Sequence, residues 1–472
     1  MNLKEKVSEE IFKIIGSVAD EQNIECYLIG GYVRDILLER PSKDIDVVVV
    51  GSGIDFAEKL RERIGKRKAT LAVFKTYGTA QIKIGKQEIE IVGARCESYE
   101  RHSRNPIVEA GTLRDDQLRR DFTINVLAIS LNSHNFGELI DPFGGIDDLH
   151  NKIIRTPCDP DITFSDDPLR MMRAIRFASQ LGFRIAEPTL EAILRNHERI
   201  SIITKERISE ELNKIILSKK PSIGFNLLDL TGLLKIIFPE LHKMRGIEKR
   251  EGKAHKDNFK HSLQVLDQLA EKSDDQWLRW ATLLHDIGKP QTKRWEEGRG
   301  WTFHNHNYIG AKMVKRIFEN LRLPLGEPMK FTQKMVNLHM RPIALIEDEV
   351  TDSAVRRLLF EAGDDIDSLM LLCESDITSN NLNKVRRFAE NYKLVRQKLI
   401  EIEEKDRIRQ FQPPIDGVEI MRLFNLPPSA IVGTLKNEIK DAILDGIIPN
   451  SYQEAYDFLI KSAREKGLEI AK

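Results

Sequence analysis

The segment that most limits how this chain can fold is LIGGYVRDILLERPSKDIDVVVV, residues 28–50. In a β-strand, residues i and i+2 project to the same face, so Asp44 and Asp46 present their carboxylates together while Ile45 and Val47 face the other way. Like charges this close are unfavourable unless a cation lies between them. Mg²⁺ suits this position, because it is held by one or two carboxylates and shares its other positions with substrate phosphates. The segment therefore predicts a magnesium site, with a solvated Asp-x-Asp at a strand edge as the alternative.

A glycine pair precedes this strand. Gly30 and Gly31 stand directly before the helical pattern YVRDILL. A Gly-Gly turn lets backbone amides approach a phosphate, and the N-terminus of a helix favours negative charge. Arg34, one turn into the helix, is placed to contact the phosphates of a bound triphosphate. The alternative is an ordinary strand-to-helix turn.

Length and composition set the wider limits. A chain of 472 residues is too long for one core, so two to four domains are expected. The formal net charge is +0, so any nucleic-acid surface must be a local patch. The four cysteines are scattered without a CxxC pair. The chain shows neither a signal-peptide h-region nor an apolar run of bilayer length, so we predict a cytoplasmic protein without a membrane partner. No protein partner is evident from the sequence.

The pattern along the chain predicts an α+β fold. Short β-rich segments such as CYLIGG, DIDVVVVG, GTAQIKIG and QEIEIVGAR alternate with helical patterns in the first third. Residues 96–113 are polar and lack a period, which predicts a loop. From about residue 165 nearly every pattern is helical. We predict a mixed strand-and-helix head over 1–150, a helical neck over 151–245, a helical metal-binding domain over 246–400 and a helical tail over 401–472.

Three further motifs follow the first site. LRRDFTINVLAIS places Arg119, Arg120 and Asp121 just before a predicted helical segment that contains Asn125. DPFGG begins at Asp141. A later helix carries arginines at i, i+3 and i+6, which lie along one side of it: Arg170, Arg173 and Arg176. Such a row repels itself unless phosphates or neighbouring carboxylates neutralise it, and both readings stay open.

The series GGYVRD, DID, RRDFTIN, DPFGG and DDPLRMMRAIRF, in this order, resembles the bacterial class II tRNA nucleotidyltransferase and poly(A) polymerase family, and most of all its CCA-adding members that carry an HD domain. The resemblance implies a polymerase-β-like head in which Asp44 and Asp46 hold Mg²⁺. It implies that the other motif residues bind the nucleotide: Gly30, Gly31, Arg34, Arg119, Arg120, Asp121, Asn125, Asp167, Arg170, Arg173 and Arg176. Asp167 and Arg170 match the pair that serves as a protein template for the incoming base.

The template role has a physical basis. A carboxylate accepts a hydrogen bond from an exocyclic amine, and a guanidinium donates to a ring nitrogen. Cytosine and adenine both offer an amine beside a ring acceptor, whereas guanine and uracil offer the reverse pattern. An Asp-Arg pair therefore accepts C and A and rejects G and U, with about 1–3 kcal/mol for each good bidentate contact.

A second group of chemically active residues lies downstream. KHSLQVLDQLA, LLHDIGKP and LCESDITSN supply His261, His285, Asp286 and Asp376, which resemble the H…HD…D ligand set of HD phosphohydrolases. His306 and His339 are candidates for a second metal position, and His304 lies beside them in sequence. Imidazoles together with carboxylates suit a divalent transition metal such as Mn, Fe, Ni or Zn, whose identity the sequence leaves open.

The leading functional prediction is addition of C, C and A from CTP and ATP to the 3′ end of tRNA, with release of pyrophosphate. The alternatives are a poly(A) polymerase, an enzyme that adds only A, or an HD-type metal phosphohydrolase with a nucleotide-binding head. Two locally basic stretches, KMRGIEKREGKAHK and RIFENLRLPLGEPMKFTQK, are candidates for contacts with tRNA, and solvated surfaces are the alternative.

Overall fold

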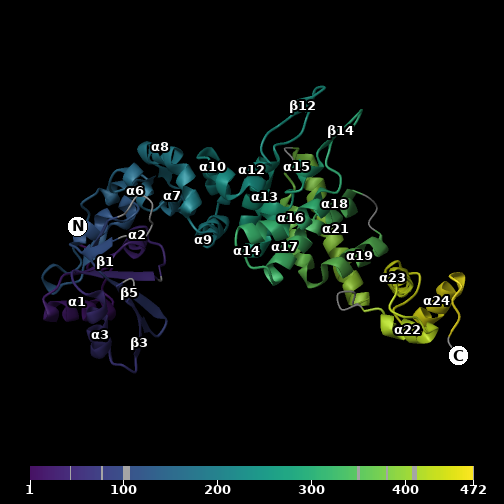
Figure 1. Cartoon of the computed structure of the whole chain (residues 1–472), viewed down its shortest axis with the longest axis horizontal. Helices are drawn as coiled ribbons and strands as arrows, with labels where there is room; N and C mark the ends of the chain where they lie inside the picture. Colours follow the sequence, from purple (N-terminus) through teal and green to yellow (C-terminus); the bar gives the residue numbers. More distant parts are fainter. Residues whose placement is uncertain are drawn as a thin grey trace. The chain divides into compact units, whose positions relative to one another are not determined.

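The computed structural model describes residues 1–42, 44–75, 78–98, 107–347, 351–378, 381–406 and 412–470. They form two compact units, Met1–Pro239 and Glu240–Lys472, which are described separately here (Figure 1). The division lies close to the predicted boundary at residue 245. The predicted boundaries at residues 150 and 400 stay predictions.

The first unit is built on a mixed seven-stranded sheet of order β3-β4-β5-β2-β1-β8-β9. Its neighbouring strands are antiparallel except for β2 and β5, which run parallel. The strands are β1 Cys26–Ile29, β2 Asp44–Val49, β3 Ala69–Phe74, β4 Thr79–Ile84, β5 Gln87–Gly93, β8 Ala128–Ser130 and β9 Leu139–Ile140. The predicted head, a mixed sheet with helices, is confirmed, although β3, β8 and β9 were not among the predicted strands.

Helices α1 (Glu10–Gln22), α2 (Gly31–Leu37) and α3 (Gly53–Ile64) accompany this sheet. Ser52 caps α3 by accepting a hydrogen bond from the Asp55 backbone N–H. The helix buries Phe56, Ala57 and Leu60 and packs on β4 and β5. Helix α2 packs on the central strands β1 and β2, and β2 carries the first carboxylates of the candidate site.

Two local predictions were wrong. Within the predicted loop at 96–113, strands β6 (Arg95–Ser98) and β7 (Ile107–Ala110) pair and are followed by helix α4 (Leu113–Leu118); residues 99–106 of that loop lie outside the described residues. The predicted helix around Asn125 is a single 3₁₀ turn, Thr123–Asn125, because the chain enters strand β8 three residues later.

The rest of the first unit is helical apart from the short parallel pair β10 (Ile153–Ile154) and β11 (Arg184–Ile185). Its helices are α5 Gly145–His150, α6 Pro160–Asp166, α7 Leu169–Leu181, α8 Glu187–Asn196, α9 Lys205–Ile216, α10 Pro221–Leu230 and α11 Leu233–Ile237, with a 3₁₀ segment at His197–Ile202. Helix α12 (Pro239–His242) spans the division between the units. Asp141 of the DPFGG motif accepts hydrogen bonds from the backbone of Gly145 and Ile146, which fixes the start of α5.

The second unit is a helical body with two small hairpins, β12 (Lys249–Arg250) with β13 (Lys253–Ala254) and β14 (Arg294–Glu296) with β15 (Gly300–Thr302). Its helices are α13 Asn258–Ala270, α14 Gln276–Leu284, α15 Lys289–Thr292, α16 His306–Asn320, α17 Glu327–Leu338, α18 Met340–Glu347, α19 Asp352–Ala362, α20 Ile366–Ser375, α21 Leu382–Asp406, α22 Gly417–Phe424, α23 Ala430–Leu444 and α24 Tyr452–Glu465.

One hydrophobic core runs through this unit. Buried residues of α13 and α20, such as Leu269 and Leu369, belong to the same cluster as Leu435 and Leu459 of the last two helices. Arg357 of α19 strengthens this attachment through ion pairs with Asp441 and Asp445 at 3.1 and 2.9 Å. The predicted helical tail therefore packs on the body of its unit. Among the described residues, no helix has both the length and the apolar composition needed to cross a bilayer.

Candidate functional site

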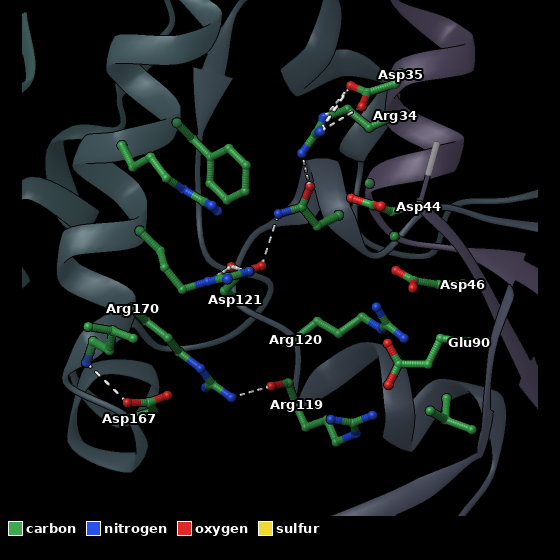
Figure 2. Close-up of a pocket in the computed structure, with 18 of the residues that line it drawn as sticks. Arg34, Asp35, Asp44, Asp46, Glu90, Arg119, Arg120, Asp121, Asp167 and Arg170 are labelled. Carbon is green, nitrogen blue, oxygen red and sulfur yellow. Dashed lines mark hydrogen bonds and ion pairs between the residues drawn. The ribbon is translucent and has the colours of Figure 1, made fainter. Parts of the chain in front are cut away.

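A cavity of about 560 Å³ in the first unit collects the residues of the first predicted site (Figure 2). Its walls come from β2, β5, α2, the turn before β8, and helix α7. All thirteen residues predicted for this site line it: Gly30, Gly31, Arg34, Asp44, Asp46, Arg119, Arg120, Asp121, Asn125, Asp167, Arg170, Arg173 and Arg176. Segments up to about 150 residues apart in sequence thus form one site, while the roles of the individual residues stay predictions.

The acidic side of the cavity lies on two parallel strands. Asp44 and Asp46 face the cavity, and Ile45 between them is buried, as the alternation in β2 predicts. The register of β2 with β5 places Glu90 opposite Asp46, so that a third carboxylate lines the same cavity. The sequence analysis missed Glu90, although its alternation with Ile89 in QEIEIVG was a usable signal.

The charge of these groups indicates a cation site. Burial raises the pKa of Asp46, Arg120 lowers it, and Glu90 and Asp44 raise it, which gives a net pKa of about 6. A carboxylate that its neighbours make this costly to ionise is stabilised by a cation. Asp44, Asp46 and Glu90 offer the hard oxygen donors that Mg²⁺ prefers, so the residues present fit the predicted ion.

The glycine turn closely approaches the same site. Gly30 has φ +81°, a conformation that side chains rarely adopt. A Cβ at this position would lie 3.0 Å from Asp46 Oδ2 and 3.2 Å from an Arg120 nitrogen. Glycine is therefore required here both by the backbone and by the space between acid and base.

A chain of hydrogen bonds runs from α2 to α7 across the cavity. Arg34 donates to Asp35 at 2.9 and 3.0 Å and to the side-chain oxygen of Asn125 at 2.8 Å. Asn125 donates to Asp121 at 3.0 Å, and Asp121 forms an ion pair with Arg173 at 2.6 Å. Burial would raise the pKa of Asp121, but Arg173 and Asn125 outweigh it and lower the pKa to about 2. Arg34, predicted to contact a triphosphate, thus also orients Asn125.

Arg119 and Arg120 are held by a residue that the sequence analysis missed. Asp116, fully buried, accepts from Arg119 at 2.9 Å and from Arg120 at 3.0 Å. Both guanidiniums remain partly exposed and line the cavity. Asp116 is thus placed to aim two cations at the site. The signal was its spacing of three and four residues to the two arginines, which directly follow the end of α4.

The arginine row on α7 is partly neutralised by protein carboxylates. Arg173 pairs with Asp121, and Arg176 lies 3.1 Å from the buried Glu211. Phe177 packs between cations, with the guanidinium carbons of Arg34, Arg173 and Arg176 at 5.1, 5.7 and 4.2 Å from its ring centre. The carboxylate reading of the row therefore holds for Arg173 and Arg176.

Asp167 and Arg170, the predicted template pair, have separate partners. Asp167 forms an ion pair with Arg207 at 3.0 Å. Arg170 donates to the backbone carbonyl of Arg119 at 2.5 Å (Figure 2). Both side chains line the cavity, and a base would have to replace these contacts to be read by them. Arg207 was not predicted, because its partner lies 40 residues away in sequence.

In the second unit, Asp286 lies at the centre of a histidine cluster. Its Oδ2 is 3.5 Å from His261 Nε2 and 3.3 Å from His285 Nε2. Its Oδ1 is 3.3 Å from His306 Nε2 and 3.9 Å from His339 Nε2. Two groups of potential metal ligands thus share Asp286, each with its ligand atoms within 4.8 Å of one another. Both predicted positions, including the possible second one, are brought together.

Asp376 completes the first group: its carboxylate lies 2.9 Å from His261 Nε2 and 3.8 Å from His285 Nε2. Lys289 forms an ion pair with Asp286 at 2.5 Å. His304, in contrast, is exposed and pairs with Glu296, so it lies outside the cluster.

The orientation of the rings favours a metal. In His285, His306 and His339, Nδ1 donates to the backbone carbonyl three residues earlier, at 2.7, 2.8 and 2.7 Å. When such a ring is neutral, this bond leaves the lone pair on Nε2, the nitrogen that faces Asp286. The Nε2 atoms of His306 and His339 face each other at 3.3 Å. Inward lone pairs beside a shared carboxylate fit a divalent cation.

In the absence of a metal, the cluster favours a proton on His285 beside the two carboxylates. Burial lowers the pKa of His285, but Asp286 and Asp376 outweigh it and raise the pKa to about 9. Burial and the charge of His285 lower the pKa of His339 to about 3. The cluster thus stabilises one positive charge, on His285 next to Asp286, and disfavours a second proton on His339.

Three family models match the chain. The poly A polymerase head domain covers residues 26–155, the probable RNA and SrmB-binding site of polymerase A covers 182–245, and the HD domain covers 258–380. The A-adding tRNA nucleotidyltransferase of Deinococcus radiodurans is 31% identical over 364 residues, which are 75% of this chain and 80% of that protein. The multifunctional CCA protein of Shewanella frigidimarina is 35% identical over 64% of this chain and 70% of that protein. The chain belongs to the tRNA nucleotidyltransferase and poly(A) polymerase family.

Other relatives are longer. The chain matches 42% of the length of the A-adding tRNA nucleotidyltransferase of Aquifex aeolicus and 26% of that of Geobacter sulfurreducens, at 32% and 40% identity. Among solved structures, the Thermotoga maritima CCA-adding enzyme complexed with tRNA is similar with a TM-score of 0.62 and 21% identity, over 98% of this chain and 99% of that chain. This likeness confirms the predicted fold class, a polymerase head followed by a helical HD domain.

Proposed function

We propose that the first unit transfers nucleotides from CTP and ATP to the 3′ end of tRNA, adding C, C and A and releasing pyrophosphate. The observation that carries this proposal is the single cavity in which Asp44, Asp46 and Glu90 face a Gly-Gly turn on one side and Asp167 with Arg170 on the other. An acidic cation site, a phosphate site and a base-reading pair are the three parts that such a reaction needs.

In this proposal the residues divide the work by position. Gly30 and Gly31 let the backbone and the start of α2 approach the triphosphate closely, and Arg120 adds a cation beside them. Asp44, Asp46 and Glu90 would hold Mg²⁺, which lowers the pKa of the attacking 3′-hydroxyl and neutralises charge on the phosphates. Asp116 orients Arg119 and Arg120 toward the cavity by forming ion pairs with both.

Base selection falls to Asp167 and Arg170. An incoming C or A would exchange the contact of Asp167 with Arg207, and that of Arg170 with the Arg119 carbonyl, for its own amine and ring nitrogen. The selectivity argument for C and A against G and U applies to this pair. Because it accepts both C and A, the pair alone does not distinguish CCA addition from addition of A only.

Addition of A only is the alternative with the most support from relatives, because the relatives from Deinococcus radiodurans, Aquifex aeolicus and Geobacter sulfurreducens all carry that name. A poly(A) polymerase is the third possibility, supported by the head-domain model.

An incorporation assay separates these products. It uses Mg²⁺, each labelled nucleotide in turn, and three acceptors: tRNA lacking CCA, tRNA ending in CC, and an unstructured RNA. We expect C, C and A to be added and synthesis to stop, with no addition by the Asp44→Ala/Asp46→Ala variant. Addition of A to the CC end alone would mean an A-adding enzyme, and long A tails on any RNA would mean a poly(A) polymerase. No incorporation of any nucleotide would overturn the proposal.

The second unit supports a second candidate function, a metal-dependent phosphohydrolase. The observation that favours it is the pair of inward-facing Nε2 atoms on His306 and His339 beside the shared Asp286. A bound divalent ion would activate water for attack on a phosphate. Release of phosphate from phosphate esters by the loaded protein, lost in an Asp286→Asn variant, tests this function.

A further inference from the structure

Two hairpins of the second unit lie against each other next to the histidine cluster. Figure 1 shows β12 and β14 extending from the helical body. Lys253 of the first hairpin donates to the Gly298 carbonyl of the second at 2.6 Å, and Lys293 forms an ion pair with Glu248. The first hairpin precedes His261, and the second connects Asp286 to His306.

The first hairpin is built at a cost to its own stability. Arg250 and Lys253 are direct partners across its two strands, and like charges in this position destabilise a hairpin. Glu251 at the turn has φ +50°, in the left-handed region that favours glycine. All residues from Lys249 to Ala254 are exposed, so no core compensates these terms. Local strain of this kind is found at binding sites.

The second hairpin supplies aromatic surface. Trp295 and Trp301, two of the four tryptophans of the chain, are partners across its strands with ring centres 5.3 Å apart. The Arg250 guanidinium lies 5.0 Å from the ring centre of Trp295, and Lys293 lies 5.2 Å from that of Trp301. Cations and indoles thus alternate over one surface.

The charge of the surface is positive although the chain is neutral as a whole. Residues 248–256 and 293–303 contain seven lysines and arginines against four glutamates. Glu248 is already bound to Lys293, Glu251 lies 3.5 Å from Arg250, and Glu296 accepts from Thr302 and His304. With seven cations against four carboxylates, the surface keeps a net positive charge that an outside anion can neutralise.

We propose that the two hairpins form a binding surface for single-stranded RNA. Arg250 and Lys253 bind a phosphate between them, which removes their mutual repulsion, and Trp295 stacks with a base. Alternating cations and aromatic faces are what a single strand requires, whereas an acidic peptide has no planar group to stack. The inference rests on the proposed function only in that RNA is the ligand, and it does not require nucleotide transfer.

The test compares two triple variants of the full chain that each remove three positive charges. Lys249→Ala/Arg250→Ala/Lys253→Ala alters the first hairpin. Lys312→Ala/Lys315→Ala/Lys330→Ala, also exposed, is the matched control on helices α16 and α17. The Kd for a fluorescently labelled single-stranded RNA of about 12 nucleotides is measured by anisotropy over a range of salt. We expect the hairpin variant to raise Kd about tenfold and to reduce the salt slope by roughly 0.7, the value for the loss of one phosphate contact.

Two further measurements make the result specific to the hairpins. Quenching of tryptophan fluorescence by the RNA should be reduced in Trp295→Leu. The melting temperature of the hairpin variant should be equal to or above that of the wild type, because a repulsion has been removed. If the hairpin variant melts at a lower temperature and also binds RNA more weakly, the loss of affinity is explained by unfolding, and the inference is overturned.

Other outcomes are equally decisive. Equal weakening by both triple variants would mean non-specific charge and would overturn the inference, as would binding of polyglutamate at the same affinity as RNA. In the Asp44→Ala/Asp46→Ala background the hairpin effect should persist. If the protein incorporates no nucleotide but the hairpin variant still binds RNA more weakly, only the proposed function is overturned. If incorporation is normal and the hairpin variant binds RNA as the wild type does, only this inference is overturned.

Discussion

The position of Gly30 predicts a sharp response to a single methyl group. Gly30→Ala should destabilise the protein by about 1–3 kcal/mol, because φ +81° is unfavourable for alanine. It should also abolish nucleotide transfer, because the Cβ would lie between Asp46 and Arg120. Gly144→Ala is the control: its φ of +72° carries strain, but nothing lies within 4 Å of the added carbon. Urea unfolding and incorporation are measured on both variants, and loss of transfer in the control would contradict the explanation.

The pKa of Asp46 predicts a pH dependence. Its folded value of about 6 is above the ordinary 3.8, so the neutral form is favoured by folding. In the metal-free protein this carboxyl lowers stability as pH rises from about 4 to 6 and has no further effect above that. Mg²⁺ needs the ionised form, so its affinity should fall about tenfold for each pH unit below 6. Calorimetric titration with Mg²⁺ between pH 5 and 8 checks this, and Asp46→Asn should bind weakly at every pH.

At the scale of single residues, the sequence predicts the site residues whose positions follow from local spacing along the chain. Asp44, Asp46, Gly30 and the arginines of α7 followed from strand alternation, turn chemistry and helical period. The partners Glu90 and Glu211 did not, because strand register and tertiary packing bring them to the site.

Helix α7 depends on an ion pair between elements. Removing one partner of a buried pair leaves an uncompensated charge, so Arg173→Ala should destabilise the protein by about 3 kcal/mol by stranding the buried Asp121. Arg195→Ala breaks an exposed pair with Asp161 and should change stability little. The free energy of unfolding in urea is measured for both. Equal effects would mean that burial of the pair is unimportant.

The histidine cluster predicts a metal count that depends on which ligand is lost. The wild type should bind two divalent ions, His339→Gln one, and Asp286→Asn none, because only Asp286 belongs to both groups. Metal analysis after dialysis gives the count. His304→Gln is the control, since His304 lies outside the cluster. One ion retained by Asp286→Asn would contradict the sharing.

Elements were predicted unevenly. Helices with a clear apolar period, such as α2 and α7, were found. Strands β6 and β7 were assigned to a loop, because CESYERHSRNPIVEAGTL lacks alternation and only pairing between its ends forms the strands.

For the whole molecule, the division into two compact units predicts two unfolding transitions in calorimetry. CTP or ATP with Mg²⁺ should raise the melting temperature of one, and a transition metal that of the other. At 100 times Kd each ligand should add about 2.7 kcal/mol to its own unit. A single transition shifted by both ligands would contradict independent units.

The sequence predicts separate domains because the head and the histidine-rich segment differ in pattern, and the boundaries within the two units stay predictions. The packing of the last helices on the body was not, since Arg357 and its partners Asp441 and Asp445 are more than 80 residues apart.

The single carboxylate of Asp286 also determines the order in which metals are bound. Each oxygen of this carboxylate faces a different histidine pair. An ion bound at one oxygen would draw electron density from the carboxylate and make the other oxygen a weaker ligand. Two cations on one shared carboxylate would repel each other, so the two positions would fill one after the other, the second more weakly than the first. Where metal is scarce the protein would hold one ion, and the weaker position would fill only as the supply increased.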